Sequence, residues 1–192
     1  MAKEKGLPCE LIEAIDRTNE EQKRVLGAKI IAYFEERGGI QGKTIALFGL
    51  AFKPDTDDMR EAPSLVLIQQ LIDAGASVRL FDPVAMDNAR KVILPSPQIS
   101  WCENEWQAAQ DADAVALATE WYRFTTLDFK RLRTVMRGNA FFDGRNLFSP
   151  DEMGRLGFDY LSIGRPPVHA YEEEAQEPVL VPVLKSSPFH CC

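Results

Sequence analysis

The sequence predicts an α/β fold: a doubly wound, mainly parallel six-stranded sheet, Rossmann-like in its order 3-2-1-4-5-6, preceded by a long helix. From Gly42 onward, short apolar runs of strand length alternate with stretches of helical periodicity, which is typical of parallel strands joined by crossover helices. Right-handed crossovers favour the doubly wound order, which places strands 1 and 4 side by side at the switch point. Before Gly42, residues 8–37 carry apolar side chains at helical spacing.

The stretch 8–37 is expected to form one helix that Gly38 and Gly39 end. About 28 residues of helix would run roughly 42 Å, more than is needed to cover a small sheet. Polar residues that include Asn19 interrupt its apolar stripe midway. The segment is therefore either a plain amphipathic helix that covers the domain or one that meets another subunit around Asn19. The stripe consists of Leu11, Ile12, Ile15, Val25, Leu26, Ile30, Tyr33 and Phe34.

The sheet is expected between residues 40 and 167, preceded by the helical segment 1–39 and followed by a disordered tail, 168–192, that contains an acidic run. Small apolar residues at 114–118 suit a buried central strand. Strands are expected at 44–48, 77–81, 99–101, 114–118, 140–142 and 160–162, and helices at 64–74, 85–91, 104–110, 127–136 and 150–156.

Composition and charge exclude several classes of protein. The net charge of −7 and the pI near 5.0 disfavour nucleic-acid binding, for which a basic surface is expected. No apolar run approaches the roughly 20 residues of a membrane helix, and the first residues do not form a signal peptide. The four cysteines form no C-x-x-C motif, so a reduced, cytoplasmic setting is expected.

The loop after the first strand is the main candidate for function. In open α/β sheets, ligands bind outside the carboxyl ends of the strands. Lys53, Arg60 and the backbone N–H groups of the following helix could hold a phosphate. Three nearby aspartates weaken that positive field, so a solvated polar loop is equally compatible with the sequence, which has neither standard phosphate-binding glycine motif here.

Other strand exits should add polar groups to the same edge of the sheet. The fourth strand is followed by Thr119, Glu120 and Trp121, and the fifth by Asp143, Arg145 and Asn146. Arg145 is interpreted as a ligand-binding group, with a salt bridge to Asp143 as the alternative. Asp82, after the second strand, could accept from ribose hydroxyls or could form a simple Asp-Pro turn.

Few residues in this chain suit catalysis. His169 and His190 both follow the last expected strand, which leaves no Ser-His or Cys-His pair in the domain and no His/Cys cluster for a transition metal. Cys102 is expected to be a small buried hydrophobe. No catalytic residue and no metal ligand is therefore assigned, and the chain by itself is interpreted as a binder.

Several segments resemble one known family. GKTIALFGLAFKPDTDDMREAPS, GASVRLFDP, ATEW, FFDGRN and YLSIGRP are similar to the carboxyl-terminal part of the UDP-glucose 6-dehydrogenase family, and LPCELIEAIDRTNEEQKRV resembles the end of that family's central dimerisation helix. The resemblance runs from about residue 7 to residue 166. Related enzymes that act on GDP-mannose or UDP-N-acetylmannosamine share this architecture. The sequences of the motifs FKPDTDDMRE and DGRN are most similar to the UDP-glucose branch of the family.

The resemblance implies roles for four residues. Phe52, Lys53 and Arg145 would contact a UDP-sugar, Arg60 would reach NAD, and the 8–37 helix would build a homodimer. The family oxidises UDP-glucose twice at C6 with NAD, through a catalytic cysteine whose segment these 192 residues do not contain. The chain alone is therefore expected to be inactive, as the nucleotide-sugar-binding portion of a dehydrogenase. The alternative is a stand-alone nucleotide-binding and dimerisation module.

Overall fold

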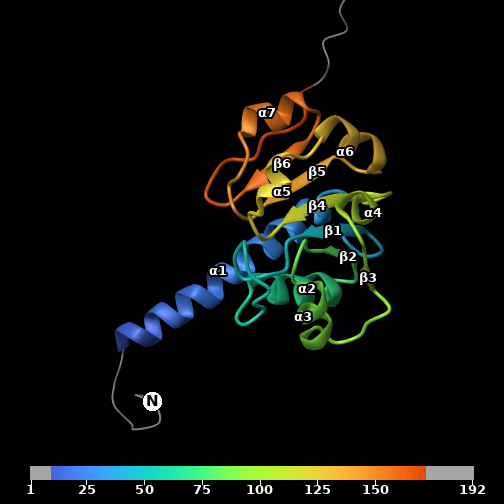
Figure 1. Cartoon of the computed structure of the whole chain (residues 1–192). Helices are drawn as coiled ribbons and strands as arrows, with labels where there is room; N and C mark the ends of the chain where they lie inside the picture. Colours follow the sequence, from blue (N-terminus) through green and yellow to red (C-terminus); the bar gives the residue numbers. More distant parts are fainter. Residues whose placement is uncertain (1–9, 172–192) are drawn as a thin grey trace, which may run out of the picture.

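The computed structural model describes residues 10–171 (Figure 1). Its six strands are β1 (Thr44–Phe48), β2 (Ser77–Phe81), β3 (Ile99–Trp101), β4 (Ala114–Leu117), β5 (Ala140–Asp143) and β6 (Asp159–Ser162). They form one sheet in the order β3-β2-β1-β4-β5-β6, and every neighbouring pair is parallel. The predicted fold class and strand order are confirmed. Figure 1 shows helices on both faces of this sheet.

The helices begin and end within two residues of the expected positions, with one addition. A short helix, α5, is the next element after β4, where a loop is expected from the sequence. With only four residues, it is too short to show a helical period. The helices are α1 (Glu10–Glu35), α2 (Pro63–Asp73), α3 (Met86–Val92), α4 (Glu105–Ala109), α5 (Tyr122–Thr125), α6 (Phe129–Val135) and α7 (Pro150–Arg155).

The central strands are buried on both faces. Every residue of β4 and β5 is buried, as are four of the five residues of β1. Strands that are covered by helices on both faces need continuous apolar runs instead of alternation, which is what these segments have. A cluster of aromatic rings fills the space beside β5, where Phe141 and Phe158 pack edge to face with Phe129. This rigid core fixes the positions of the strand ends.

Helix α1 has two unlike halves. Its carboxyl-terminal half packs beside α2 and against β5, and buries Leu26, Ile30, Tyr33 and Phe34. The hydroxyl of Tyr33 donates to Asp159 Oδ2 at 2.7 Å, which ties the helix to β6. The amino-terminal half extends away from the sheet (Figure 1) and exposes three large apolar side chains, Leu11, Ile12 and Ile15, by 75%, 54% and 51%.

The chain remains packed for a short distance beyond the last strand. Val168 pairs with Tyr160 in an antiparallel bridge, and the Tyr171 amide donates to the Gly154 carbonyl at 3.0 Å. The rest of the expected tail, together with Cys9, His190 and the two terminal cysteines, lies outside the described residues. No helix within residues 10–171 is both long enough and apolar enough to cross a membrane.

Candidate functional site

The carboxyl ends of β1 and β4 lie in direct contact. Gly49 has a φ of 83°, and a Cβ atom there would lie 2.7 Å from the Thr119 backbone nitrogen, so only glycine fits. The Thr119 hydroxyl in turn donates to the Ala51 carbonyl at 2.6 Å. The loop after β1 therefore leaves the sheet in a fixed direction, beside the exit of β4.

A hollow of about 860 Å³ lies at this edge of the sheet. Its walls come from α1, from the β1–α2 loop and from the segments that follow β4, β5 and β6. Phe52 and Arg145, which come from separate strand exits, both line it. Phe52 exposes 48% of its surface, which is unusual for a phenylalanine and leaves its ring free to meet a ligand. We call this space the rim hollow.

Arg145 is already paired in the rim hollow. Its Nη2 donates to Glu120 Oε1 at 2.7 Å, and its Nε donates to the other carboxylate oxygen. The alternative partner, Asp143, binds the Arg145 backbone N–H instead, at 2.8 Å. The hydrogen bond from Arg145 lowers the pKa of Glu120 despite the partial burial of that carboxylate, and Glu120 raises the pKa of Arg145. Each side chain is 33% exposed, so the pair is accessible to an anion.

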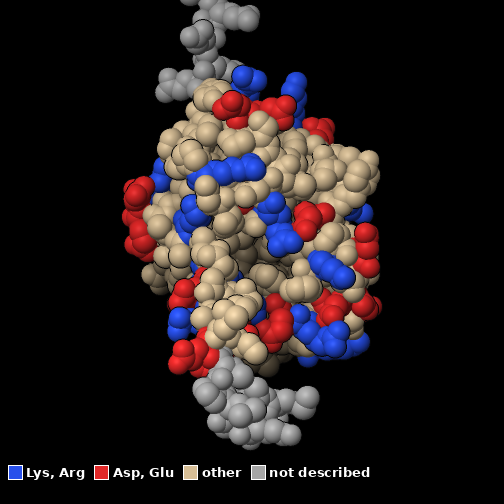
Figure 2. All heavy atoms as spheres, turned by 90° about the vertical axis from the view of Figure 1, so that its left-hand side faces the viewer, with Lys and Arg blue, Asp and Glu red and all other residues tan. Residues whose placement is uncertain are grey.

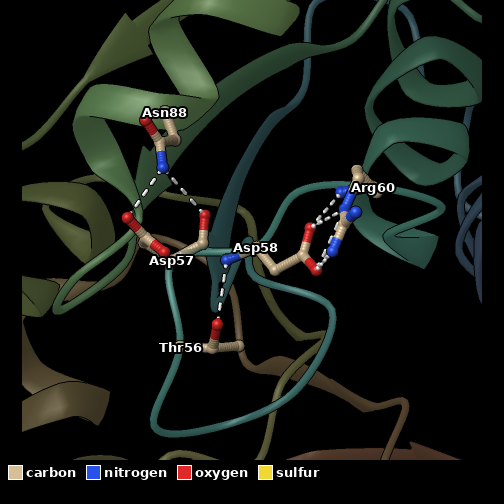
Figure 3. A network of polar contacts seen from close by, with 5 residues as sticks. All are labelled: Thr56, Asp57, Asp58, Arg60 and Asn88. Carbon is tan, nitrogen blue, oxygen red and sulfur yellow. Dashed lines mark hydrogen bonds and ion pairs between the residues drawn. The ribbon is translucent and has the colours of Figure 1, made fainter.

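The other two predicted cations are placed differently. Arg60 donates to Asp58 through Nη2 at 2.7 Å, and its side chain is 88% exposed (Figure 3). This bond lowers the pKa of Asp58 to about 2, and the charge of Lys53 contributes to that shift. Arg60 lines a second, smaller hollow of about 620 Å³ beside α3. Lys53 is exposed and lies outside the described lining of both hollows.

The predicted site residues therefore fall into two groups. Phe52 and Arg145 share the rim hollow, whereas Arg60 faces the second hollow and Lys53 lies near Asp58. Figure 3 shows the part of the β1–α2 loop that lies beside α3, where Asp57 accepts from the side chain of Asn88 at 2.8 Å. One loop thus presents groups to two neighbouring surfaces.

Lys23 is a lining residue of the rim hollow that the sequence did not indicate. Its side chain is only 15% exposed, and its ammonium group contacts Glu20 at 2.7 Å and Glu61 at 2.6 Å. The contact to Glu61 joins α1 to the β1–α2 loop. The hydrogen bonds from these two carboxylates raise the pKa of Lys23. The Glu20–Lys23 spacing on a helix was the only sequence signal for such a pair.

Acidic and basic groups alternate around the rim hollow. Three carboxylates, of Asp16, Glu20 and Glu61, line it together with the two cations Lys23 and Arg145. Figure 2 looks at the face from which α1 projects and shows Lys and Arg side chains interspersed with Asp and Glu. The hollow therefore has no uniform positive field to attract a phosphate.

Asp82 is buried at 1% exposure, so it cannot reach a ribose. Its Oδ1 accepts from the backbone N–H groups of Val84 and Ala85 at 2.9 and 2.7 Å. Asp82 therefore forms the Asp-Pro turn and not the contact to a ribose. Cys102 is buried as expected, and burial raises its pKa above the ordinary value. Within residues 10–171, no group of three or more His, Cys, Asp or Glu side chains is arranged to hold a metal ion.

The region that contains these strand exits matches a known protein family. Residues 46–150 match the UDP binding domain of the UDP-glucose/GDP-mannose dehydrogenase family. The chain belongs to this family. The matched region contains the β1–α2 loop, both strand exits that meet at Gly49, and Arg145 of the rim hollow.

Curated proteins that are similar in sequence to this chain are named UDP-glucose 6-dehydrogenase. That of Rhizobium meliloti is 42% identical over 165 residues, which cover 86% of this chain and 37% of the relative. That of Pseudomonas aeruginosa is 43% identical over 171 residues, with the same two shares. The chain thus spans a little over a third of the length of these relatives.

Solved structures agree with the family assignment. A UDP-glucose dehydrogenase from the archaeon Pyrobaculum islandicum matches with a TM-score of 0.61 and 31% identity, over 75% of this chain and 31% of that one. A UDP-D-ManNAc dehydrogenase from Pyrococcus horikoshii matches with a TM-score of 0.69 over 86% of this chain and 36% of that one. At 23% identity, the second structure bears on the fold alone.

Proposed function

We propose that this chain is the nucleotide-sugar-binding portion of an NAD-dependent UDP-glucose 6-dehydrogenase, and that a UDP-sugar binds in the rim hollow. The observation that carries the proposal is the meeting of Phe52 and Arg145 in one hollow, inside a region that matches a UDP binding domain. The volume of about 860 Å³ lies within the range of roughly 300–1,000 Å³ found for small-molecule sites.

Arg145 is the group proposed to hold the pyrophosphate. A guanidinium donates two parallel N–H bonds to phosphate oxygens, which is the geometry that it now offers to Glu120. Binding would therefore exchange one anionic partner for another. The exposed ring of Phe52 supplies an apolar surface against which a sugar or base can lie. Lys53, on the same loop, is proposed to reach the UDP-sugar with its long, flexible side chain.

The charges of the rim hollow predict modest affinity for UDP. Both of its cations are already paired with carboxylates, and acidic groups outnumber basic ones in the lining. A UDP-sugar must displace Glu120 from Arg145, and its phosphates are repelled by the negative charges of Glu20 and Glu61. A second wall supplied by further polypeptide would bury more of the ligand and would strengthen binding.

Arg60 is proposed to contact NAD. Its guanidinium is almost fully exposed and lines the second hollow together with Lys91. Three carboxylates, of Asp57, Asp58 and Glu61, line that hollow too, so a phosphate or ribose edge would have to displace Asp58 from Arg60. The two cations fit one edge of a dinucleotide. NAD, where bound, would supply the hydride acceptor. The described residues would contribute orientation of the cofactor to that step.

The proposed parent reaction is the conversion of UDP-glucose to UDP-glucuronate by two hydride transfers to NAD. The proposed role of these 192 residues is binding, without turnover on their own. Within residues 10–171, Cys102 is the one cysteine, and it is buried with a raised pKa, so it does not offer a reactive thiolate.

Helix α1 is proposed to form a homodimer. The exposed side chains of Leu11, Ile12 and Ile15 lie on the half that projects from the domain, where nothing else in the described chain covers them. Large apolar side chains in such a group mark interaction sites. The same feature favours the alternative function, a stand-alone binding and dimerisation module. If a longer protein that contains this chain oxidises UDP-glucose, the dehydrogenase function is supported and the stand-alone module is excluded.

Titration calorimetry of the purified chain with UDP tests the proposal. We expect a single weak site whose occupancy UDP-glucose competes for, and no NADH when UDP-glucose and NAD are mixed with the chain. Heat with uridine but not with UDP would contradict the role of Arg145, because uridine lacks the phosphates that this residue is proposed to hold. No binding of UDP or UDP-glucose at millimolar concentration would refute the proposed function.

A further inference from the structure

The carboxylate of Asp82 is a buried hub of hydrogen bonds between two loops of the rim hollow. It is 1% exposed, and within residues 10–171 no Lys or Arg forms an ion pair with it. Five N–H groups donate to it instead. Oδ2 accepts from the backbone of Leu50 at 2.6 Å and of Ala51 at 3.1 Å, and from the indole of Trp121 at 3.1 Å.

These donors lie next to the proposed ligand-binding groups. Leu50 and Ala51 directly precede Phe52 on the β1–α2 loop. Trp121 directly follows Glu120, the carboxylate that orients Arg145. A single buried oxygen therefore joins the loop that presents Phe52 to the segment that presents the partner of Arg145.

The chemistry of this position requires a carboxylate. An ionised aspartate only accepts hydrogen bonds and has about four lone pairs to offer, whereas an asparagine would turn two donors of its own toward some of these five N–H groups. Bonds to a charged acceptor are also roughly twice as strong as neutral ones. The other oxygen, Oδ1, is held by the turn after β2, so the carboxylate cannot rotate away.

We propose that Asp82 is a positioning residue of the rim hollow: by accepting from Leu50, Ala51 and Trp121, it holds the loop that carries Phe52 against the exit of β4 and so keeps Phe52 in the hollow that Arg145 also lines. The inference rests on the proposed function for its ligand, although the loop contacts stand without it. Asp82 itself touches no ligand, because it is buried.

Asp82→Ala tests the inference, with Asp113→Ala as the matched control. Asp113 is also a buried carboxylate, 8% exposed, and it accepts the Thr44 amide at 2.8 Å, but at the opposite end of the strands. Both variants should lose stability. Only Asp82→Ala should speed hydrogen exchange at the Leu50 and Ala51 amides by more than its loss of stability accounts for. Only it should weaken UDP binding, by up to about tenfold, because a displaced Phe52 no longer buries its ring against the ligand.

Each outcome bears on the inference. Unchanged exchange at both amides, or unchanged UDP affinity in Asp82→Ala, would overturn it, as would an equal loss of affinity in Asp113→Ala. If the wild-type chain binds no UDP, the proposed function fails, and faster exchange at Leu50 and Ala51 still supports Asp82 as the group that positions the loop. If Asp82→Ala does not fold, Asp82→Asn, which keeps the shape of the side chain, decides by the same two readouts.

Discussion

Replacement of Arg145 by alanine is the sharpest test of the rim hollow. A hydrogen bond between a guanidinium and a phosphate contributes about 1.5–3 kcal/mol. In the wild type, UDP must first displace Glu120, and a pair in which each side chain is 33% exposed is worth at most about 1 kcal/mol. The net loss in Arg145→Ala should therefore be about 0.5–2 kcal/mol, or roughly twofold to thirtyfold in Kd.

The assay is calorimetry of UDP binding. Two further variants are expected to change the Kd for UDP differently from Arg145→Ala. Glu120→Gln should bind UDP as tightly as the wild type or up to about fivefold more tightly, because Arg145 is freed from a charged partner. Arg137→Ala removes another paired arginine, one that contacts Asp113 at the far end of the strands, and should not change Kd. The reasoning is refuted if Arg145→Ala and Arg137→Ala bind UDP equally well.

Three predictions concern stability and reactivity. Tyr33→Phe should lower the free energy of unfolding in urea by about 1.5–3 kcal/mol, because it removes a buried hydrogen bond to the Asp159 carboxylate; an unchanged midpoint would contradict this. Asp113→Asn should be less stable than the wild type at neutral pH. Burial alone would raise the pKa of Asp113, but Arg137 and the Thr44 amide lower it below 3.8, so this difference should shrink as the pH falls through that lowered pKa; a gap that persists in acid would argue against the pairing. Cys102 should resist alkylation, followed by peptide mass spectrometry, until the chain unfolds; rapid labelling of the native chain would contradict its burial.

The sequence was sufficient for the fold because the signals for the fold are local. Alternating strand and helix patterns from Gly42 onward predicted a mainly parallel six-stranded sheet, and the right-handedness of crossovers predicted its order. The small apolar residues of 114–118 predicted a buried central strand, and β4 is buried throughout. Helix α5 was not predicted, because four residues leave no periodic signal.

The site was predicted only in part, because its contacts join residues far apart in the chain. Arg145 and Phe52 were both expected at the carboxyl edge, and both line the rim hollow. The partner of Arg145, however, is Glu120, which lies 25 positions away in the sequence. Lys23 was missed because only the packing angle of α1 brings that helix to the rim. No spacing rule encodes such an angle.

Helix α1 would couple the proposed homodimerisation to the proposed binding of UDP in the rim hollow. The same helix that exposes Leu11 and Ile15 also supplies one wall of the rim hollow through Asn19 and Lys23. A dimer contact on the outer half would restrain that wall. Under the proposal that this restraint favours UDP binding, bound UDP would favour dimerisation by the same factor, because coupling between two binding events is reciprocal. Under the proposed homodimerisation, apparent UDP affinity should thus rise with protein concentration, and sedimentation should report larger particles once UDP is added.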